Sequence, residues 1–370
     1  GETKLGEIGG TISVDVKVTN TGDVAGKDVV QLYYASPYDP AEGIEKSAID
    51  LGAFAKTSLL EPGASETVTL TLNVDDMAAY DYRNAQCYVL SSGDYALRLQ
   101  TDSHNVKVNG DGTEVDEIIY TVDDKVVYND ANQGKRSTDV VEAVNRFDDV
   151  TAGDGFFGED AEITYVSRSD WAGTMPTSRE TSMNAAAYAE AMVLMTNNTS
   201  GWDYDLDNLP QAEPAVTGAD NGLEIADMVG LEFDDPLWQD LIEQMSVDEL
   251  RKLYGTCGWS NPAVLSINKS AAIDMDGAEG LHDLTSDRTA NQYVGSTVRG
   301  ATWNTALAYD MGLVYGDECL ANGVSGMYGM TVNIHRSPFN GRCFEAYSED
   351  PLLSGKIAAE EIRGLQEKGI

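Results

Sequence analysis

The strongest constraint on the fold of this chain is the alternation of apolar and polar residues in its first hundred positions. Ile12, Val14, Val16 and Val18 alternate with polar residues, as in a strand that buries one face. Further strands are predicted over residues 29–34, 66–72 and 93–99, with turn sequences rich in Asn, Asp, Gly and Pro between them. About seven short strands in about 100 residues predict a β-sandwich over residues 1–105.

The last part of the chain, residues 236–370, has a different pattern in which helical periodicity alternates with short apolar runs. Ser246 and Glu249 form the sequence signature of a capping box, so a helix is predicted to begin there and run to about residue 254. Other helices are predicted over 238–245, 302–321 and 354–368, and strands over 271–276 and 331–335. This alternation predicts an α/β architecture with parallel strands.

Residues 106–235 give no comparable pattern, and we predict an acidic connector with some helix, over residues 139–147 and 182–195. Asp203, Asp205 and Asp207 alternate like the start of a calcium loop. That loop also needs Gly at its sixth position and Glu at its twelfth, where this chain has Asn208 and Pro214, so the calcium-loop interpretation is rejected. Scattered cysteines and histidines likewise form no ligand motif, and no metal or other cofactor is predicted.

The net charge excludes two classes of partner. The chain has 62 acidic and 24 basic residues, which gives a formal net charge of −38. Such a surface repels phosphate backbones and anionic lipids, so neither nucleic acid nor a membrane is an expected partner. A membrane-spanning helix is not expected either, because no sufficiently long apolar run exists in the sequence.

Three segments of the predicted sandwich resemble a domain of known type. They are VKVTNTGDVAGKDVVQLYYASP, LLEPGASETVTLTL and SSGDYALRL, which begin at residues 16, 59 and 91. Together they resemble the fibronectin type III-like domain that occurs in many enzymes of glycoside hydrolase family 3. A sandwich by itself would not indicate a function.

The last 135 residues carry motifs that resemble the catalytic barrel of the same family. The matching sequences are DGAEGL (276–281), ATWNTALA (301–308), NIHRSP (333–338), GRCFE (341–345) and YSEDP (347–351). The resemblance implies the first part of a TIM-like (β/α) barrel over residues 236–370, after the sandwich, as in family members with a permuted domain order. Ala278 replaces the usual Pro and His282 the usual Arg, departures that concern the substrate more than the family.

The resemblance also implies three sugar-binding residues: Asp276, Arg342 and Arg336. A carboxylate at a strand end accepts hydrogen bonds from neighbouring hydroxyls, and the guanidinium of Arg342 is a rigid fork of donors. Arg336 is expected to support the site. The alternatives are that Asp276 is only a turn residue before Gly, and that Arg342 only pairs with Glu345 or Glu349. A structural role is expected for His335.

No catalytic residue is identified. The family nucleophile follows a Lys-His pair, which is missing from this sequence, and lies in a Ser-Asp-Trp motif late in the barrel. Ser169-Asp170-Trp171 has those letters but precedes the barrel motifs, so Asp170 is interpreted as a loop residue. A complete barrel needs about 250 residues, so we expect a fragment whose reacting carboxylates lie outside the chain.

These observations predict part of a retaining, β-glucosidase-like glycoside hydrolase that acts on terminal β-linked glucosides or oligosaccharides, the isolated chain being inactive. The location is left open, with a preference for the bacterial cytoplasm. The main alternative is a non-catalytic carbohydrate-binding or surface-interaction protein, and a weaker one is an acidic structural module without a ligand.

Overall fold

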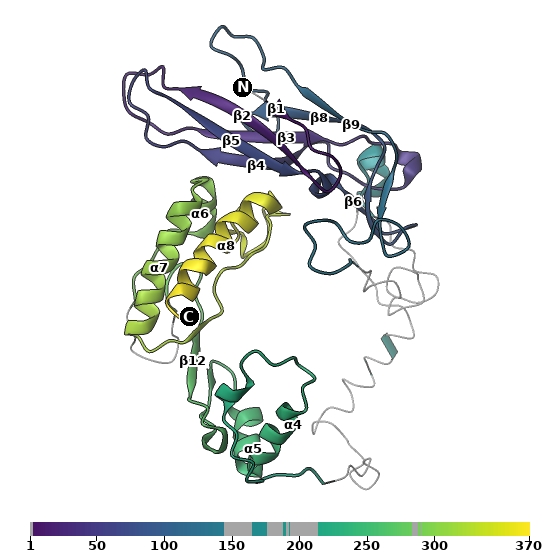
Figure 1. Cartoon of the computed structure of the whole chain (residues 1–370). Coiled ribbons are helices and arrows are strands. Elements are labelled where there is room, and N and C mark those ends of the chain that lie inside the picture. The colour runs from purple at the N-terminus through teal and green to yellow at the C-terminus, as the bar shows by residue number, and fades with distance from the viewer. Residues whose placement is uncertain are drawn as a thin grey trace. The chain divides into compact units, whose positions relative to one another are not determined.

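The computed structural model describes residues 3–143, 165–175, 188–189, 192, 214–282, 288 and 290–370. The chain forms two compact units, Gly1–Leu209 and Pro210–Ile370, and Figure 1 labels many of their elements. Within the described ranges, no helix is long and apolar enough to cross a membrane.

The first unit consists of antiparallel strands in three sheets. The strands are β1 (Thr3–Lys4), β2 (Thr11–Thr19), β3 (Val29–Ala35), β4 (Asp50–Lys56), β5 (Ser65–Asn73), β6 (Ala79–Asp81), β7 (Cys87–Leu90), β8 (Gly93–Gln100), β9 (Ile118–Val122) and β10 (Val126–Tyr128). The sheet orders are β4-β3-β8-β9, β1-β2-β5 and β10-β7-β6. The predicted β-sandwich is thereby confirmed.

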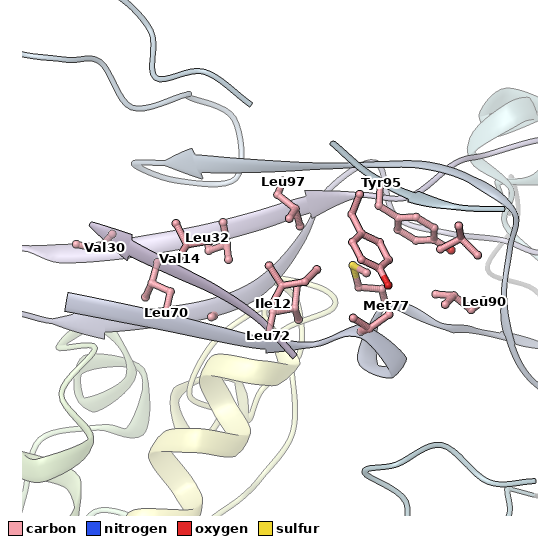
Figure 2. Close-up of a cluster of buried hydrophobic side chains, with 14 of the residues drawn as sticks. Ile12, Val14, Val30, Leu32, Leu70, Leu72, Met77, Leu90, Tyr95 and Leu97 are labelled. Atoms are coloured by element: carbon pink, nitrogen blue, oxygen red, sulfur yellow. The ribbon is translucent and has the colours of Figure 1, made fainter. Parts of the chain in front are cut away.

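The sandwich is held together by apolar side chains that the alternating pattern directs inward. Figure 2 shows Ile12 and Leu70 from one sheet together with Leu32, Tyr95 and Leu97 from the facing sheet. Each of these five side chains is at most 1% exposed. Because β2 pairs with β5 in register, the buried residues of both strands line the same face of the sheet, which is what a period of two requires.

The sandwich continues past residue 105, where the sequence predicted the connector to begin. β9 pairs with β8, with Ile118 opposite Leu97, and β10 pairs with β7. Both strands are short, so their own alternation is a weak signal, and pairing with a preformed neighbour decides their structure. Residues 139–143 are not helical, and most of the predicted helices over 139–147 and 182–195 lie outside the described residues.

Asp75, in the short helix η2 (Val74–Met77), has a buried carboxylate. Its hydrogen bonds join parts of the sandwich that lie far apart in the sequence. Its oxygens accept hydrogen bonds from Gly9 N at 2.9 Å, Tyr128 OH at 2.7 Å and Ser137 N at 2.9 Å. Burial acts to raise the pKa of Asp75, but the hydrogen bonds from Ser137, Tyr128 and Gly9 outweigh it, so the pKa lies below its ordinary value.

The second unit combines helices with a small mixed sheet. Its main elements are α4 (Leu237–Gln244), α5 (Val247–Thr256), β11 (Ser260–Asn261), β12 (Ala272–Met275), α6 (Ser296–Ala301), α7 (Thr305–Ala321), β13 (Gly326–Met327) and α8 (Pro351–Glu367). β12 and β13 are parallel neighbours connected through α6 and α7, whereas β11 is antiparallel to β12. The region is therefore α/β, as predicted, although the strand expected over 331–335 is only a single bridge between Ile334 and Ser348.

The beginning of the second unit is a small apolar cluster around α4. Leu241 and Met245 pack with Met228, Val264 and Ile267. Residues before 236, which were predicted to belong to the connector, therefore form part of this cluster. The predicted capping box opens α5: Ser246 Oγ accepts from Glu249 N at 3.3 Å, and Glu249 Oε2 accepts from Ser246 N at 2.9 Å.

A buried ion pair joins α6 to α8. Arg299 Nε lies 3.1 Å from Glu361 Oε2, and the two side chains are 6% and 0% exposed. Tyr347 OH donates to the same oxygen at 2.9 Å, while Glu361 Oε1 has no hydrogen-bond partner within the described part of the chain. Burial raises the pKa of Glu361 and the Arg299 charge opposes that rise. Because both groups are buried away from water, removing either one would leave the other as an uncompensated buried charge.

We expect Asp75→Asn to lower the free energy of unfolding by about 2–4 kcal/mol at neutral pH, since an amide replaces a buried acceptor of three hydrogen bonds. Because the folded pKa is depressed, this stabilisation is complete above the unfolded pKa of about 3.9 and is lost as the pH falls through the folded value. Urea unfolding at pH 7 and pH 3 measures it. Asp94→Asn, which removes an exposed acceptor, is the control; equal losses in the two variants would contradict the assignment.

For the second unit, Arg299→Met is expected to lower the free energy of unfolding by about 3–5 kcal/mol, because it leaves Glu361 buried without its partner. The double variant Arg299→Met/Glu361→Leu should recover most of that loss. Arg363→Met breaks an exposed pair with Glu360 and should change the free energy of unfolding far less than Arg299→Met does. Urea unfolding followed by helical circular dichroism compares the three variants, and equal effects of Arg299→Met and Arg363→Met would refute the prediction.

Candidate functional site

Asp276 follows β12 directly and lies at the carboxyl end of the parallel pair of strands. Its side chain is exposed, and Oδ1 accepts a hydrogen bond from Gly277 N at 2.9 Å. In the part of the chain that the structure describes, Oδ2 has no hydrogen bond. Asp276 is thus a turn residue, as one interpretation proposed, but this role occupies only one of its oxygens and leaves the other open to a ligand.

The loop after Asp276 needs its two glycines. Gly277 and Gly280 both have φ of 129°, a region that residues with a Cβ rarely adopt. A Cβ at Gly277 would lie 1.8 Å from the carbonyl oxygen of Gly280, and one at Gly280 would lie 2.1 Å from that of Asn291. The sequence Asp-Gly-x-x-Gly therefore fixes a tight loop with the carboxylate at its start.

The core of the unit holds this loop through its carbonyl groups. Arg299 Nη2 donates to the carbonyl of Ala278 at 2.9 Å, and the hydroxyl of Tyr315 donates to the carbonyl of Gly277. Both side chains are buried, at 6% and 0% exposure. The same guanidinium that pairs with Glu361 therefore positions the backbone next to Asp276.

Arg342 is the second predicted site residue, and its ion pair with Glu345 is present. Arg342 Nε and Nη2 donate to the two carboxylate oxygens of Glu345 at 2.9 and 2.6 Å. Thr331 Oγ1 donates to Glu345 Oε2 at 2.7 Å, which holds the carboxylate from its other side. The Arg342 side chain nevertheless stays 70% exposed, so its remaining N–H donors face solvent.

Electrostatics connects the two predicted residues. The hydrogen bonds and charge of Glu345 raise the pKa of Arg342, and the Asp276 carboxylate raises it further. The hydrogen bonds from Arg342 lower the pKa of Glu345 against the effect of its burial. Asp276 thus lies close enough to Arg342 for its charge to act on the guanidinium.

The other residues of the motif differ in their surroundings. Arg336 is exposed and makes neither a hydrogen bond nor an ion pair within the described ranges. His335 Nε2 lies 2.7 Å from the carbonyl oxygen of Cys343 and 3.0 Å from that of Ala346, which assigns this ring the role of holding the turn that contains Arg342. Donation to both carbonyls requires the proton on Nε2.

Sequence reasoning missed Glu279, inside the Asp276 loop. Its Oε1 is buried and has no hydrogen-bond partner among the described residues. Burial raises the pKa of Glu279; Arg299 opposes this effect and Glu345 adds to it. The sequence signal that could have identified Glu279 was its position between Gly277 and Gly280, both of which the loop requires. The buried pair of Arg299 and Glu361 gave none, since its members are 62 residues apart.

Asp170 of the Ser-Asp-Trp sequence has a role in local helix capping. It is exposed and caps the short helix α2 (Trp171–Thr174), where Oδ1 accepts from Gly173 N at 3.0 Å. Local capping accounts for this carboxylate, in agreement with the loop interpretation. The three alternating aspartates of the rejected calcium loop lie outside the described residues.

The exposed residues of the second unit can bind neighbouring hydroxyl groups. Asp276 provides an acceptor, Arg342 provides several donors in one plane, and the core fixes the backbone beneath them. We assign neither residue to bond cleavage, since a glycosidase needs two carboxylates across the reacting bond and Asp276 and Arg342 provide only one.

Comparison with known proteins identifies the two domain types that the sequence motifs resemble, in the same order along the chain. Residues 28–103 match the fibronectin type III-like domain, and residues 266–370 match the glycosyl hydrolase family 3 N-terminal domain. The chain is 30% identical to β-glucosidase A of Butyrivibrio fibrisolvens, over 98% of this chain and 41% of that protein. It is 27% identical to a β-glucosidase of Ruminococcus albus, over 97% of this chain and 34% of that protein.

A solved structure covers the whole chain. The β-glucosidase of Paenibacillus barengoltzii aligns with 100% of it at a TM-score of 0.64 and 28% identity, and the chain covers 37% of that protein. The chain thus spans about two fifths or less of the length of these relatives. Residues 266–370 therefore belong to the N-terminal domain of glycosyl hydrolase family 3, a fibronectin type III-like domain precedes them in this chain, and the relatives that match both parts are β-glucosidases.

Proposed function

We propose that this chain carries the sugar-binding part of a β-glucosidase-type active site, which holds the terminal glucosyl unit of a β-linked glucoside. The observation that carries the proposal is the exposed Asp276 carboxylate at a strand end, together with an exposed Arg342 whose fork is oriented by Glu345. The names of the relatives supply the substrate class, since they are β-glucosidases.

Each residue has a separate task in this proposal. Asp276 Oδ2 accepts hydrogen bonds from ring hydroxyls, and the donors of Arg342 not used by Glu345 bind hydroxyl oxygens. Glu345 keeps the guanidinium in one orientation, which reduces the entropy lost on binding. Arg336 contributes a positive charge and has the smaller effect.

The parallel pair β12 and β13, with its helical connection, is proposed to be the opening of a (β/α) barrel, in which active-site residues gather at the carboxyl ends of the strands. The parent enzyme is proposed to cleave with retention. It would use two carboxylates about 5–5.5 Å apart, as nucleophile and as acid/base, that we do not assign to this chain. On its own the chain is expected to bind a glucoside without cleaving it.

Asp276→Asn is expected to weaken binding of methyl β-D-glucopyranoside to the 370-residue chain by at least about 10-fold, since hydrogen bonds to a charged acceptor are lost. Arg342→Lys, which keeps the charge and loses the fork, should also weaken binding, and more than Arg336→Ala does. Isothermal titration calorimetry measures the affinities. Asp240→Asn on α4 removes an exposed carboxylate elsewhere in the unit and should leave the affinity unchanged.

The same protein samples show whether the chain only binds the glucoside or also cleaves it. No nitrophenol is expected from p-nitrophenyl β-D-glucoside with this chain, whereas release that Asp276→Asn abolishes would show that the chain holds reacting groups too. Failure of the folded wild-type chain to bind the glucoside at all would remove the proposal.

A further inference from the structure

A cavity of about 310 Å³ lies in the first unit, between the sandwich and the later segment of residues 165–175. The connection from β3 to β4 contributes Glu45 to its lining, and the turn from β6 to β7 contributes Tyr82. The later segment contributes Tyr165 and Asp170 from the opposite side. Parts of the chain that are far apart in sequence thus enclose one space, whose volume is within the range of small-molecule sites.

Specific contacts hold the later segment on the sandwich. Ser167 Oγ and Arg168 N donate to the two carboxylate oxygens of Glu45 at 2.6 and 3.2 Å. Arg168 Nη1 donates to the carbonyl of Ser47 at 2.7 Å, and the guanidinium carbon lies 4.0 Å from the centre of the Tyr38 ring, in a cation–π contact. Charged and backbone groups therefore fix the segment that forms one wall of the cavity.

Two tyrosine rings form the apolar part of the lining. The ring centroids of Tyr82 and Tyr165 are 4.7 Å apart, and the planes are tilted by 53°. Arg83 Nε donates to the hydroxyl oxygen of Tyr82 at 2.7 Å, which orients the first ring. Tyr165 is 37% exposed, so part of the second ring remains accessible. Each ring offers an apolar face together with a polar edge.

The polar groups of the cavity include an open carboxylate oxygen. Asp170 Oδ1 accepts from Gly173 N at 3.0 Å, whereas Oδ2 has no hydrogen bond within the part of the chain that the structure describes. Glu45 and Asp170 bring negative charge to the cavity, and Arg83 and the neighbouring Arg168 balance it. Because the described charges nearly cancel, the cavity favours an uncharged ligand over a phosphate or a metal ion.

We propose that this cavity binds a sugar ring of a neutral saccharide, as a second saccharide-binding site that belongs to the first unit. A pyranose ring has hydroxyls around its rim and C–H groups on its faces. An aromatic wall beside an open carboxylate oxygen therefore matches both parts of such a ligand. Asp170 Oδ2 accepts from ring hydroxyls, and the rings of Tyr82 and Tyr165 cover the apolar face. The inference does not depend on the site at Asp276.

The test is isothermal titration calorimetry of the full chain with cellotetraose, a neutral β-linked saccharide. Asp276→Asn should still bind it, since that change leaves the cavity of the first unit intact. In this background Tyr165→Ala is expected to weaken binding about 10-fold, whereas Tyr165→Phe keeps the ring and should stay within about 3-fold. Asp170→Asn should weaken binding about 5-fold or more, because the amide oxygen can still cap α2 but the charged acceptor is lost.

Two further variants in the same background sharpen the test. Arg168→Ala removes the anchor that holds Tyr165 and Asp170 on the sandwich, so it should weaken binding at least as much as Tyr165→Ala does. Tyr254→Ala removes a ring on α5 that is 85% exposed, and it should leave the affinity for cellotetraose unchanged.

The outcomes separate this inference from the proposed function. If Asp276→Asn abolishes the cellotetraose binding of the wild type, the second site is overturned while the glucoside site stands. Binding that survives Asp276→Asn and is unchanged by Tyr165→Ala and Asp170→Asn also overturns the second site, as does a wild type that does not bind cellotetraose. If Asp276→Asn leaves binding of methyl β-D-glucopyranoside unchanged while the cavity variants lose cellotetraose, the proposed function falls and this inference stands. The Asp170→Asn result does not depend on how Tyr165→Ala folds.

Discussion

The second unit depends on the contacts that the guanidinium of Arg299 makes. It is buried, pairs with Glu361 on α8, and donates to the carbonyl of Ala278 in the loop that begins at Asp276. Helix packing and loop position are therefore coupled through one side chain. A buried pair of this kind costs desolvation energy and returns a fixed geometry, which here holds the backbone next to the exposed Asp276 carboxylate.

The parts of the fold that were predictable are those with strong local signals. The strands at residues 11–19 and 65–73 alternate over nine residues each, and the helix α5 begins with a complete capping box. β9 and β10 were missed because five or three residues carry little periodicity, and neighbouring strands supply the reason for their pairing. The strand expected over residues 331–335 is one bridge, since an apolar run alone does not provide a partner.

The site shows the same division between local and long-range information. Asp276 and Arg342 were predicted because they lie in recognisable motifs, and the charge of Asp276 contributes to the raised pKa of Arg342. Glu345 was considered only in the alternative in which Arg342 has a purely structural role. The structure shows that Arg342 pairs with Glu345 and is nevertheless 70% exposed, so the ion pair does not bury the guanidinium. The rings of Trp259 and Tyr328, 5.1 Å apart, come from the two flanks of β12, and sheet order brings them together, which no short motif encodes.

The three hydrogen bonds to Asp75 have a mechanical consequence. Gly9 precedes the first long strand, Ser137 follows the last, and both donate to the same carboxylate. The two ends of the sandwich are therefore joined at one carboxylate. A force on the backbone after Ser137 is met there before it reaches β10, whereas a force from the N-terminal side first meets the pair of β1 and β2. Tension from the C-terminal side would thus load the Asp75 carboxylate before the strand ladders.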